Sequence, residues 1–233
     1  MTVMPWDRAK LSEKTLELNF ASQLNHACRG SLLWFGLTQK QEAEQGFDIA
    51  TRVGRGLFIV QMKASTRVLR GSARQFKAPH DQLESLRSLT SGGLVKLPNS
   101  VFYAFPVIGT PGELAKHKYV LHNTWLCDVA SIPAVGLPTK RGGGLRADGN
   151  HYVNVFPGLA PLPAGVTGIA TFHSDPVEAL LLSGTAFAER LLNQDSDIPG
   201  RMGLLADLTH NDFSRFWAFS QHLGRKAFAI ARI

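Results

Sequence analysis

Asp48, Gln61 and Lys63 are the residues of this chain whose types and spacing best suit a divalent metal site beside a phosphodiester. Gly54-Arg55 separates two apolar runs and suits a two-residue hairpin turn with glycine at the first central position. That turn would place Asp48 directly opposite Gln61, with Lys63 as their diagonal neighbour on the same face. Directly opposed side chains lie roughly 5 Å apart at Cβ, so three polar groups would converge on one patch.

The other face of this hairpin is expected to be almost entirely apolar. The register pairs Phe47 with Met62, Ile49 with Val60, and Thr51 with Phe58. A slip of one residue would turn Asp48 into that apolar face, so the hydrophobic pattern itself specifies the register.

Positive charge is concentrated next to these residues. The chain has a net charge of +7 and contains no acid between Asp48 and Asp81. A concentrated basic segment is typical of a protein that binds a polyanion, and we expect its members to contact nucleic-acid phosphates. The alternative is a solvated basic surface without a partner. Besides Lys63, the basic residues of this segment are Arg52, Arg55, Arg67, Arg70, Arg74 and Lys77.

The elements that position these residues follow from hydrophobic periodicity. Ser12 can cap a helix that runs to about Ala27, in which Glu17 lies beside the apolar stripe, near the core boundary. Pro79 opens a second predicted helix, which ends near residues 91–93. The predicted strands cover residues 32–37, 47–53, 57–64, 101–108 and 119–129. This order predicts an α/β fold with a mixed sheet flanked by helices.

The remaining part of the chain has a different amino-acid composition. Residues 131–171 are rich in glycine and proline, which predicts loops with short strands around Val153 and Ile169. Two helices are expected to follow, one starting at Asp175-Pro176 and one capped by Thr209. We therefore expect a core over residues 1–130 and an extension over residues 131–233, with a single compact domain as the alternative.

Composition limits the class of protein. Hydrophobic residues make up 44 % of the chain and charged residues 18 %, which is typical of a globular protein. No apolar run approaches the roughly 20 residues of a membrane span, and the start of the chain lacks a signal-peptide pattern. Cys28 and Cys127 are expected to be buried thiols. We therefore expect a cytoplasmic protein with no membrane partner.

A helix with Glu17, a strand with Asp48 and a strand with Gln61-x-Lys63 together resemble the PD-(D/E)xK nuclease superfamily over residues 12–110. The resemblance implies a restriction-endonuclease-like core. It also implies that Mg²⁺, for which Mn²⁺ can substitute, is held by Asp48, the Gln61 side-chain oxygen and the Met62 carbonyl. Glu17 would bind this metal directly or through water, and Lys63 would orient or deprotonate the attacking water.

The chain departs from the usual pattern at Gln61, which replaces the second acid, as in the Mrr-like members of the superfamily. Glu13, Glu42 and Glu44 compete with Glu17 for the role of the helix acid. The resemblance implies a metal-dependent nuclease that acts on DNA, in anti-phage defence or a mobile element. The alternatives are a catalytically inactive nucleic-acid-binding module and a subunit of a larger defence complex. A homodimer is a further possible assembly.

Overall fold

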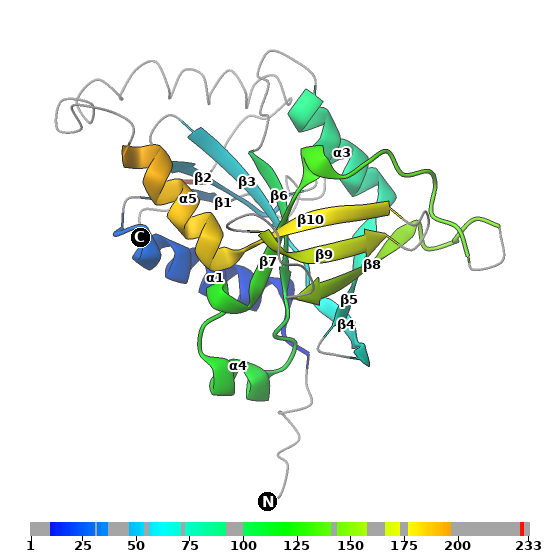
Figure 1. Cartoon of the computed structure of the whole chain (residues 1–233), viewed down its shortest axis with the longest axis horizontal. Helices are drawn as coiled ribbons and strands as arrows, with labels where there is room; N and C mark the ends of the chain where they lie inside the picture. The colour runs from blue at the N-terminus through cyan, green and yellow to red at the C-terminus, as the bar shows by residue number, and fades with distance from the viewer. Residues whose placement is uncertain are drawn as a thin grey trace, which may run out of the picture.

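The computed structural model describes residues 10–30, 32–36, 47–53, 56–70, 73–91, 100–140, 144–157, 166–172, 177–196 and 229–230. Within these ranges the chain forms one mixed sheet with helices on both faces (Figure 1), which confirms the predicted α/β class. The helices are α1 (Glu13–Ala27), α3 (His80–Ser91), α4 (Pro111–His117) and α5 (Gly184–Ser196), with 3-10 turns η3 (Leu121–Asn123) and η4 (Val129–Ser131). The strands are β1 (Leu33–Gly36), β2 (Ile49–Val53), β3 (Gly56–Met62), β4 (Ser65–Val68), β5 (Arg74–Pro79), β6 (Val101–Pro106), β7 (Thr124–Asp128), β8 (Asn150–Pro157), β9 (Val166–Phe172), β10 (Val177–Ser183) and β11 (Ala229–Ile230).

The eleven described strands lie in the order β11-β1-β2-β3-β6-β7-β10-β9-β8-β5-β4. Strands β3 and β6 pair in parallel, whereas the other neighbouring strands pair antiparallel. A parallel pair needs a crossover connection, and the chain between β3 and β6 contains β4, β5 and α3. Strands from both sides of residue 130 share this sheet, because β10 pairs with β7 and β8 pairs with β5.

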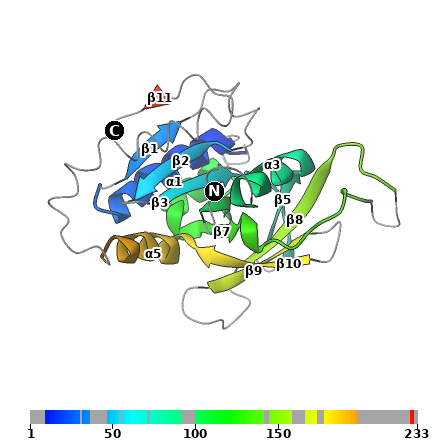
Figure 2. The ribbon, with the colours of Figure 1, turned by 90° about the horizontal axis from the view of Figure 1, so that it is seen from above.

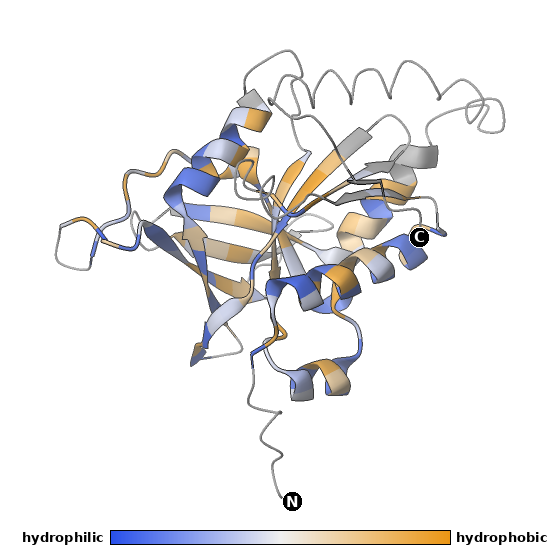
Figure 3. Cartoon of the chain, turned by 180° about the vertical axis from the view of Figure 1, so that it is seen from behind, coloured by the Kyte–Doolittle hydropathy of each residue, from blue (hydrophilic) through white to orange (hydrophobic). Residues whose placement is uncertain are grey.

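Each face of the sheet contributes to a separate hydrophobic cluster. Leu83, Leu86 and Leu89 of α3 pack on one face, against inward-facing residues of the strands from β6 to β5. Helices α1 and α5 (Figure 2) pack on the opposite face, in a cluster with residues of β3, β6 and β7. The helices carry hydrophilic and hydrophobic residues on the same turns (Figure 3), as expected when one side of a helix covers a sheet. Among the described residues, no helix has the length and apolar character needed to cross a membrane.

The predicted hairpin and first helix are confirmed. Strands β2 and β3 pair Ile49 with Val60, Thr51 with Phe58 and Val53 with Gly56, which is the expected register. The two turn residues themselves lie outside the described residues. The Ser12 side chain caps α1 by accepting a hydrogen bond from the Thr15 backbone N–H at 3.1 Å. Both cysteines are buried thiols, as expected.

The basic segment forms strands that the sequence analysis did not predict. Strands β4 and β5 lie between β3 and α3, and β5 alternates buried and accessible residues along its length. The charges of this segment suggest a solvated surface, whereas Phe76 and Ala78, which lie between the charged residues, show the period-two pattern of a half-buried strand. Helix α4 was also missed, although Thr110 forms a capping box with Glu113.

The predicted helix start at Asp175-Pro176 is wrong. Residues 177–183 form strand β10, which pairs with β9 on one side and β7 on the other. Pairing on both sides stabilises an extended backbone despite helix-favouring leucines, and exposed Glu178 and Leu180 alternate with buried Ala179 and Leu181. Strands β8 and β9 also extend well beyond the short strands expected there. The helix predicted after Thr209 lies outside the described residues.

Gly184 marks the tight junction between β10 and α5, and its replacement by alanine is expected to destabilise the fold by about 1–3 kcal/mol. A Cβ atom at this position would lie 2.1 Å from the Leu121 carbonyl oxygen, so η3 and α5 would have to separate. Urea denaturation of Gly184→Ala measures the loss of stability. Glu189→Ala, at an exposed position of the same helix, is the control and should change stability by less than about 0.5 kcal/mol. Equal stability of the two variants would contradict this packing argument.

Candidate functional site

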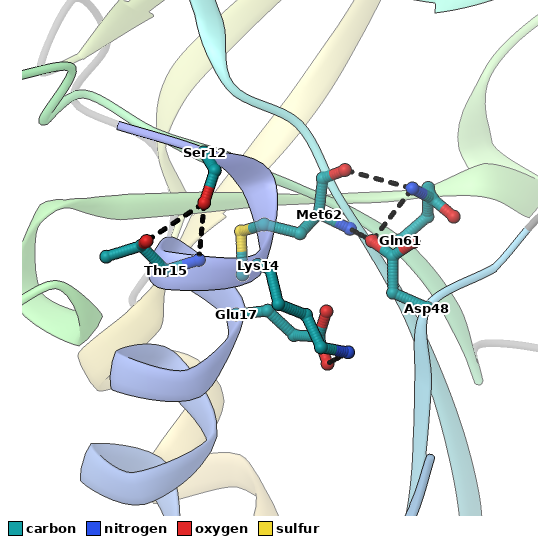
Figure 4. Close-up of polar contacts among 7 residues, drawn as sticks. All are labelled: Ser12, Lys14, Thr15, Glu17, Asp48, Gln61 and Met62. Atoms are coloured by element: carbon teal, nitrogen blue, oxygen red, sulfur yellow. Dashed lines mark hydrogen bonds and ion pairs between the residues drawn. The ribbon is translucent and has the colours of Figure 1, made fainter. Parts of the chain in front are cut away.

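The end of β3 and the residues preceding β2 form a compact polar cluster (Figure 4). The Gln61 Nε2 donates hydrogen bonds to the Asp48 Oδ2 at 2.8 Å and to the Met62 carbonyl oxygen at 2.9 Å. The Met62 backbone N–H donates to the same Asp48 oxygen at 2.8 Å. The hairpin therefore brings Asp48 against Gln61 as expected, one residue beyond Ile49 and Val60, which form the last pair of the ladder.

The Gln61 amide is only half satisfied. Its side chain is buried, and its Oε1 has no hydrogen-bond partner among the described residues. Tyr103 of β6 lies beside Gln61 in the parallel register and is fully buried. Within the described part of the chain, its hydroxyl also has no partner, and burial raises the pKa of that phenol. Buried polar atoms without partners are uncommon in folded proteins, and two of the four found among the described residues belong to the neighbouring Gln61 and Tyr103.

Asp48 sits in an environment that disfavours its ionised form. Burial raises the pKa of this carboxyl to about 7 from its ordinary 3.8, and the charges of Glu17 and Glu13 act in the same direction. The hydrogen bond from Met62 and the charge of Lys63 act in the opposite direction but do not outweigh burial. A nearby cation would relieve this unfavourable environment by stabilising the carboxylate.

Lys63 lies directly after β3 and is 6 % exposed. Its backbone N–H donates to the Ala104 carbonyl at 2.9 Å, which continues the parallel pairing with β6 and holds the residue in place. Burial lowers the pKa of the Lys63 amine, and this effect outweighs the charges of Glu13 and Asp48, which would raise it. A buried amine with a lowered pKa is more readily deprotonated than a solvated lysine.

Helix α1 contributes two acids to the surroundings of the cluster. The Glu17 Oε1 accepts a hydrogen bond from Lys14 at 2.7 Å, and Glu17 is 4 % exposed. The Glu13 Oε1 accepts a hydrogen bond from the Ala64 N–H at 3.1 Å, one residue beyond Lys63. Among the charged groups, Glu13 has the largest effect on the pKa of Lys63. Glu13 is therefore as strong a candidate as Glu17 for the helix acid of the cluster. The spacing of four residues between the two acids is the sequence signal that links them on one helix face.

The expected position of Phe47 is wrong. Strand β2 begins at Ile49, and Phe47 packs in the cluster around α3, whereas Met62 and Ile49 pack in the cluster around α1. The alternation of faces is therefore broken just before β2. At this point Asp48 accepts the Met62 N–H with its side chain, so the regular ladder does not extend to Phe47.

The basic residues of the segment differ in exposure and in ion pairing. Arg67, Arg70 and Lys77 are exposed, and Lys77 lies 3.6 Å from Asp148. Arg74 is buried and forms an ion pair with Glu113 at the start of α4, so it is not presented to a phosphate on the surface. The Arg52 side chain and the whole of Arg55 lie outside the described residues, as do the competing acids Glu42 and Glu44.

The oxygen atoms of the cluster match the preferences of a hard divalent cation. Among the described residues, no three side chains of histidine, cysteine, aspartate or glutamate form a metal-binding group. The candidate ligands are instead one carboxylate, one backbone carbonyl and one buried amide oxygen, from Asp48, Met62 and Gln61. Mg²⁺ is bound by such oxygens and keeps several water molecules, so these residues fit a Mg²⁺ site with few protein ligands.

The chain was compared with protein-family models, with curated proteins and with solved structures, and none of the three comparisons found a match.

Proposed function

We propose that this chain is a Mg²⁺-dependent nuclease that hydrolyses phosphodiester bonds in DNA. The observation that carries the proposal is the convergence of the Asp48 carboxylate and the Met62 carbonyl on the Gln61 amide, directly before the buried Lys63. Carboxylate and carbonyl oxygens are suited to hold a metal ion and its bound water. A neighbouring amine of lowered pKa is suited to accept a proton from that water.

The arrangement of elements around the cluster also supports a restriction-endonuclease-like core. Helix α1 precedes the antiparallel β1-β2-β3 meander, and α3 leads into β6, which lies parallel to β3. The β4–β5 hairpin is an insertion relative to the helix-strand-strand-helix-strand order that the resemblance implies. This insertion carries Arg67 and Lys77, two of the exposed cations available for a DNA backbone.

The proposed chemistry assigns a role to each residue. Asp48, the Gln61 Oε1 and the Met62 carbonyl would hold Mg²⁺, which when bound lowers the pKa of water and polarises the phosphoryl oxygens. Lys63 would accept or orient a proton of the attacking water and offset negative charge on the phosphate. Glu13 and Glu17 would provide an acidic rim near Lys63, and the exposed cations of β4 and β5 would bind the backbone phosphates.

The test is a cleavage assay with the full chain on supercoiled, linear and single-stranded DNA, with single-stranded RNA alongside. We expect cleavage with Mg²⁺ or Mn²⁺ and none after chelation with EDTA. Calorimetric titration with each metal should give saturable binding at one site. A protein that binds neither metal and leaves all four substrates intact would contradict the proposal.

An inactive nucleic-acid-binding module is the second candidate. The Gln61 Nε2 already donates to both Asp48 and Met62, so an amide group satisfies the two oxygens without a metal. Such a protein would bind DNA with a steep salt dependence while showing no calorimetric signal for Mg²⁺ or Mn²⁺.

Replacing Gln61 with glutamate is expected to tighten Mg²⁺ binding about tenfold. The carboxylate adds a charged ligand, and it cannot donate to Asp48 as the amide does, so the metal-free form becomes less favourable. Calorimetry at pH 8 measures the change in affinity. Gln75→Glu is the matched control, since Gln75 lies on β5 and bonds to Asn154, and it should leave the affinity unchanged. Weaker binding by the Gln61→Glu variant would contradict the assignment of Gln61 as a ligand.

A further inference from the structure

The NH₂ end of the Gln61 carboxamide stands where a third oxygen ligand would have to lie for a cation held by Asp48 and Met62. Its Nε2 lies 2.8 Å from the Asp48 Oδ2 and 2.9 Å from the Met62 carbonyl oxygen, and it donates to both. The Met62 carbonyl can only accept, and the Asp48 Oδ2 already accepts from the Met62 N–H, so the NH₂ end is the one that faces them. An NH₂ group carries partial positive charge, and it therefore serves these oxygens as a weak substitute for a metal ion.

The oxygen of the same amide lies at the opposite end of the group and accepts no hydrogen bond from the described residues. Gln61 is 1 % exposed, and its Oε1 finds no donor among the described residues. A buried acceptor without a donor is unfavourable, because it has lost its hydrogen bonds to water without replacement. The oxygen that the proposed metal site needs is thus present but points away from the other two.

Inversion of the amide about its last side-chain torsion would exchange these two ends. That torsion joins sp³ and sp² carbons and is soft, so inversion costs little apart from the hydrogen bonds that it breaks. Without a cation, inversion would bring three oxygens together and lose both bonds to Nε2, which is unfavourable. With a cation beside them, the same three oxygens would form a set of hard ligands of the kind that Mg²⁺ prefers.

We propose that the Gln61 carboxamide is a two-position switch, with its NH₂ group donating to the Asp48 and Met62 oxygens in the metal-free protein and its Oε1 taking the place of that NH₂ group when Mg²⁺ binds beside the three oxygens. This inference rests on the proposed metal site and adds a conformational step to it. The switch keeps the paired oxygens satisfied in the absence of metal. It also weakens the apparent affinity for Mg²⁺, since only the inverted fraction of molecules is competent to bind.

The test follows the Gln61 side-chain NH₂ by NMR in full-length protein labelled with ¹⁵N at glutamine amides, during titration with Mg²⁺. The Gln61 signals are assigned by their absence from the Gln61→Glu spectrum, or from that of Gln61→Met if the first variant does not fold. We expect these signals to shift with the midpoint found by calorimetry. Their protection from solvent exchange should fall at least about tenfold as the two acceptors are lost. The Gln75 signals provide the internal control and should not change, because Gln75 bonds to Asn154 outside the cluster.

The outcomes separate the switch from the site on which it rests. Saturable Mg²⁺ binding with a matching change at Gln61 supports the switch. Saturable binding with unchanged Gln61 signals overturns the switch and leaves the metal site standing. Absence of saturable binding overturns the proposed metal-dependent function, and the switch with it.

Discussion

Replacing Asp48 with asparagine is expected to abolish DNA cleavage while making the protein more stable at pH 8. The activity loss, at least about 100-fold, follows because the variant loses the one carboxylate among the three proposed Mg²⁺ ligands. Asparagine keeps an oxygen that can accept from Met62 and Gln61, so the local hydrogen bonds need not break. Opposite changes in stability and activity are characteristic of a residue whose unfavourable environment serves function.

The direction of the stability change follows from the raised pKa of Asp48. Between pH 3.8 and about 7 the folded protein retains a proton that the unfolded chain releases. The stability that this group contributes is therefore fully present below pH 3.8 and is lost as the pH rises to about 7. At pH 8 the difference amounts to at most about 4 kcal/mol, since one pKa unit corresponds to about 1.4 kcal/mol.

Thermal melts from pH 4 to pH 8, without divalent metal, measure this effect. We expect the melting temperatures of wild type and Asp48→Asn to agree near pH 4, to diverge progressively between pH 4 and about pH 7, and to differ by a constant amount above that, with the variant more stable by roughly 5–10 °C at pH 8. Asp148→Asn is the matched control, because Asp148 is solvated and its pKa is lowered rather than raised. An Asp48→Asn variant that is less stable than wild type at pH 8 would contradict the assigned environment, and retained cleavage would contradict the assigned role.

Replacing Lys63 with methionine is expected to reduce the cleavage rate at least about 100-fold while DNA binding changes little. Methionine matches the length of the lysine stem and suits a buried position next to β6, so the fold should be preserved. The amine is the group that is lost, and its lowered pKa is the property that suits it to take up a proton from water. Lys63→Arg should not restore activity, because a guanidinium stays protonated.

Single-turnover cleavage between pH 6 and pH 9 separates this role from DNA binding. In the wild type the rate should rise with pH as Asp48 ionises, with a pKa of about 7, and as Lys63 loses its proton. The residual activity of Lys63→Met should keep only the rise that belongs to Asp48. Lys77→Met is the matched control, since Lys77 is an exposed lysine of β5. It should raise KM and reduce the salt dependence of binding with little effect on kcat. A Lys63→Met variant that lost only affinity would show that Lys63 binds phosphate rather than handling a proton.

Several features of this protein are encoded locally and could be predicted from the sequence. The Ser12 cap, the apolar stripe of α1 and the β2–β3 register depend on residues close to one another in the chain. The same holds for the contact between Asp48 and Gln61, because a tight turn leaves few ways to pair two short strands. The buried strand β6 was predicted equally well, since an apolar run of its length is typical of a central strand.

Other features depend on partners far away in the chain. Strand β10 is extended because β7 and β9 pair with it on both sides, although its own residues favour a helix start. Arg74 is buried because Glu113, on an element that the sequence analysis missed, neutralises it. Neither partner can be identified from local periodicity, since pairing between distant segments is decided by how the whole sheet packs.

The sequence by itself determined which polar groups stand at the end of the β2–β3 hairpin, because turn geometry and hydrophobic pattern act within about fifteen residues. Only the tertiary structure decided their environment. Packing against α1 and β6 buries Asp48 and Lys63 and brings Glu13 toward the lysine, and it also leaves the Gln61 oxygen without a donor. Burial and electrostatic environment arise from every element that surrounds a group, so they exist only once those elements have assembled.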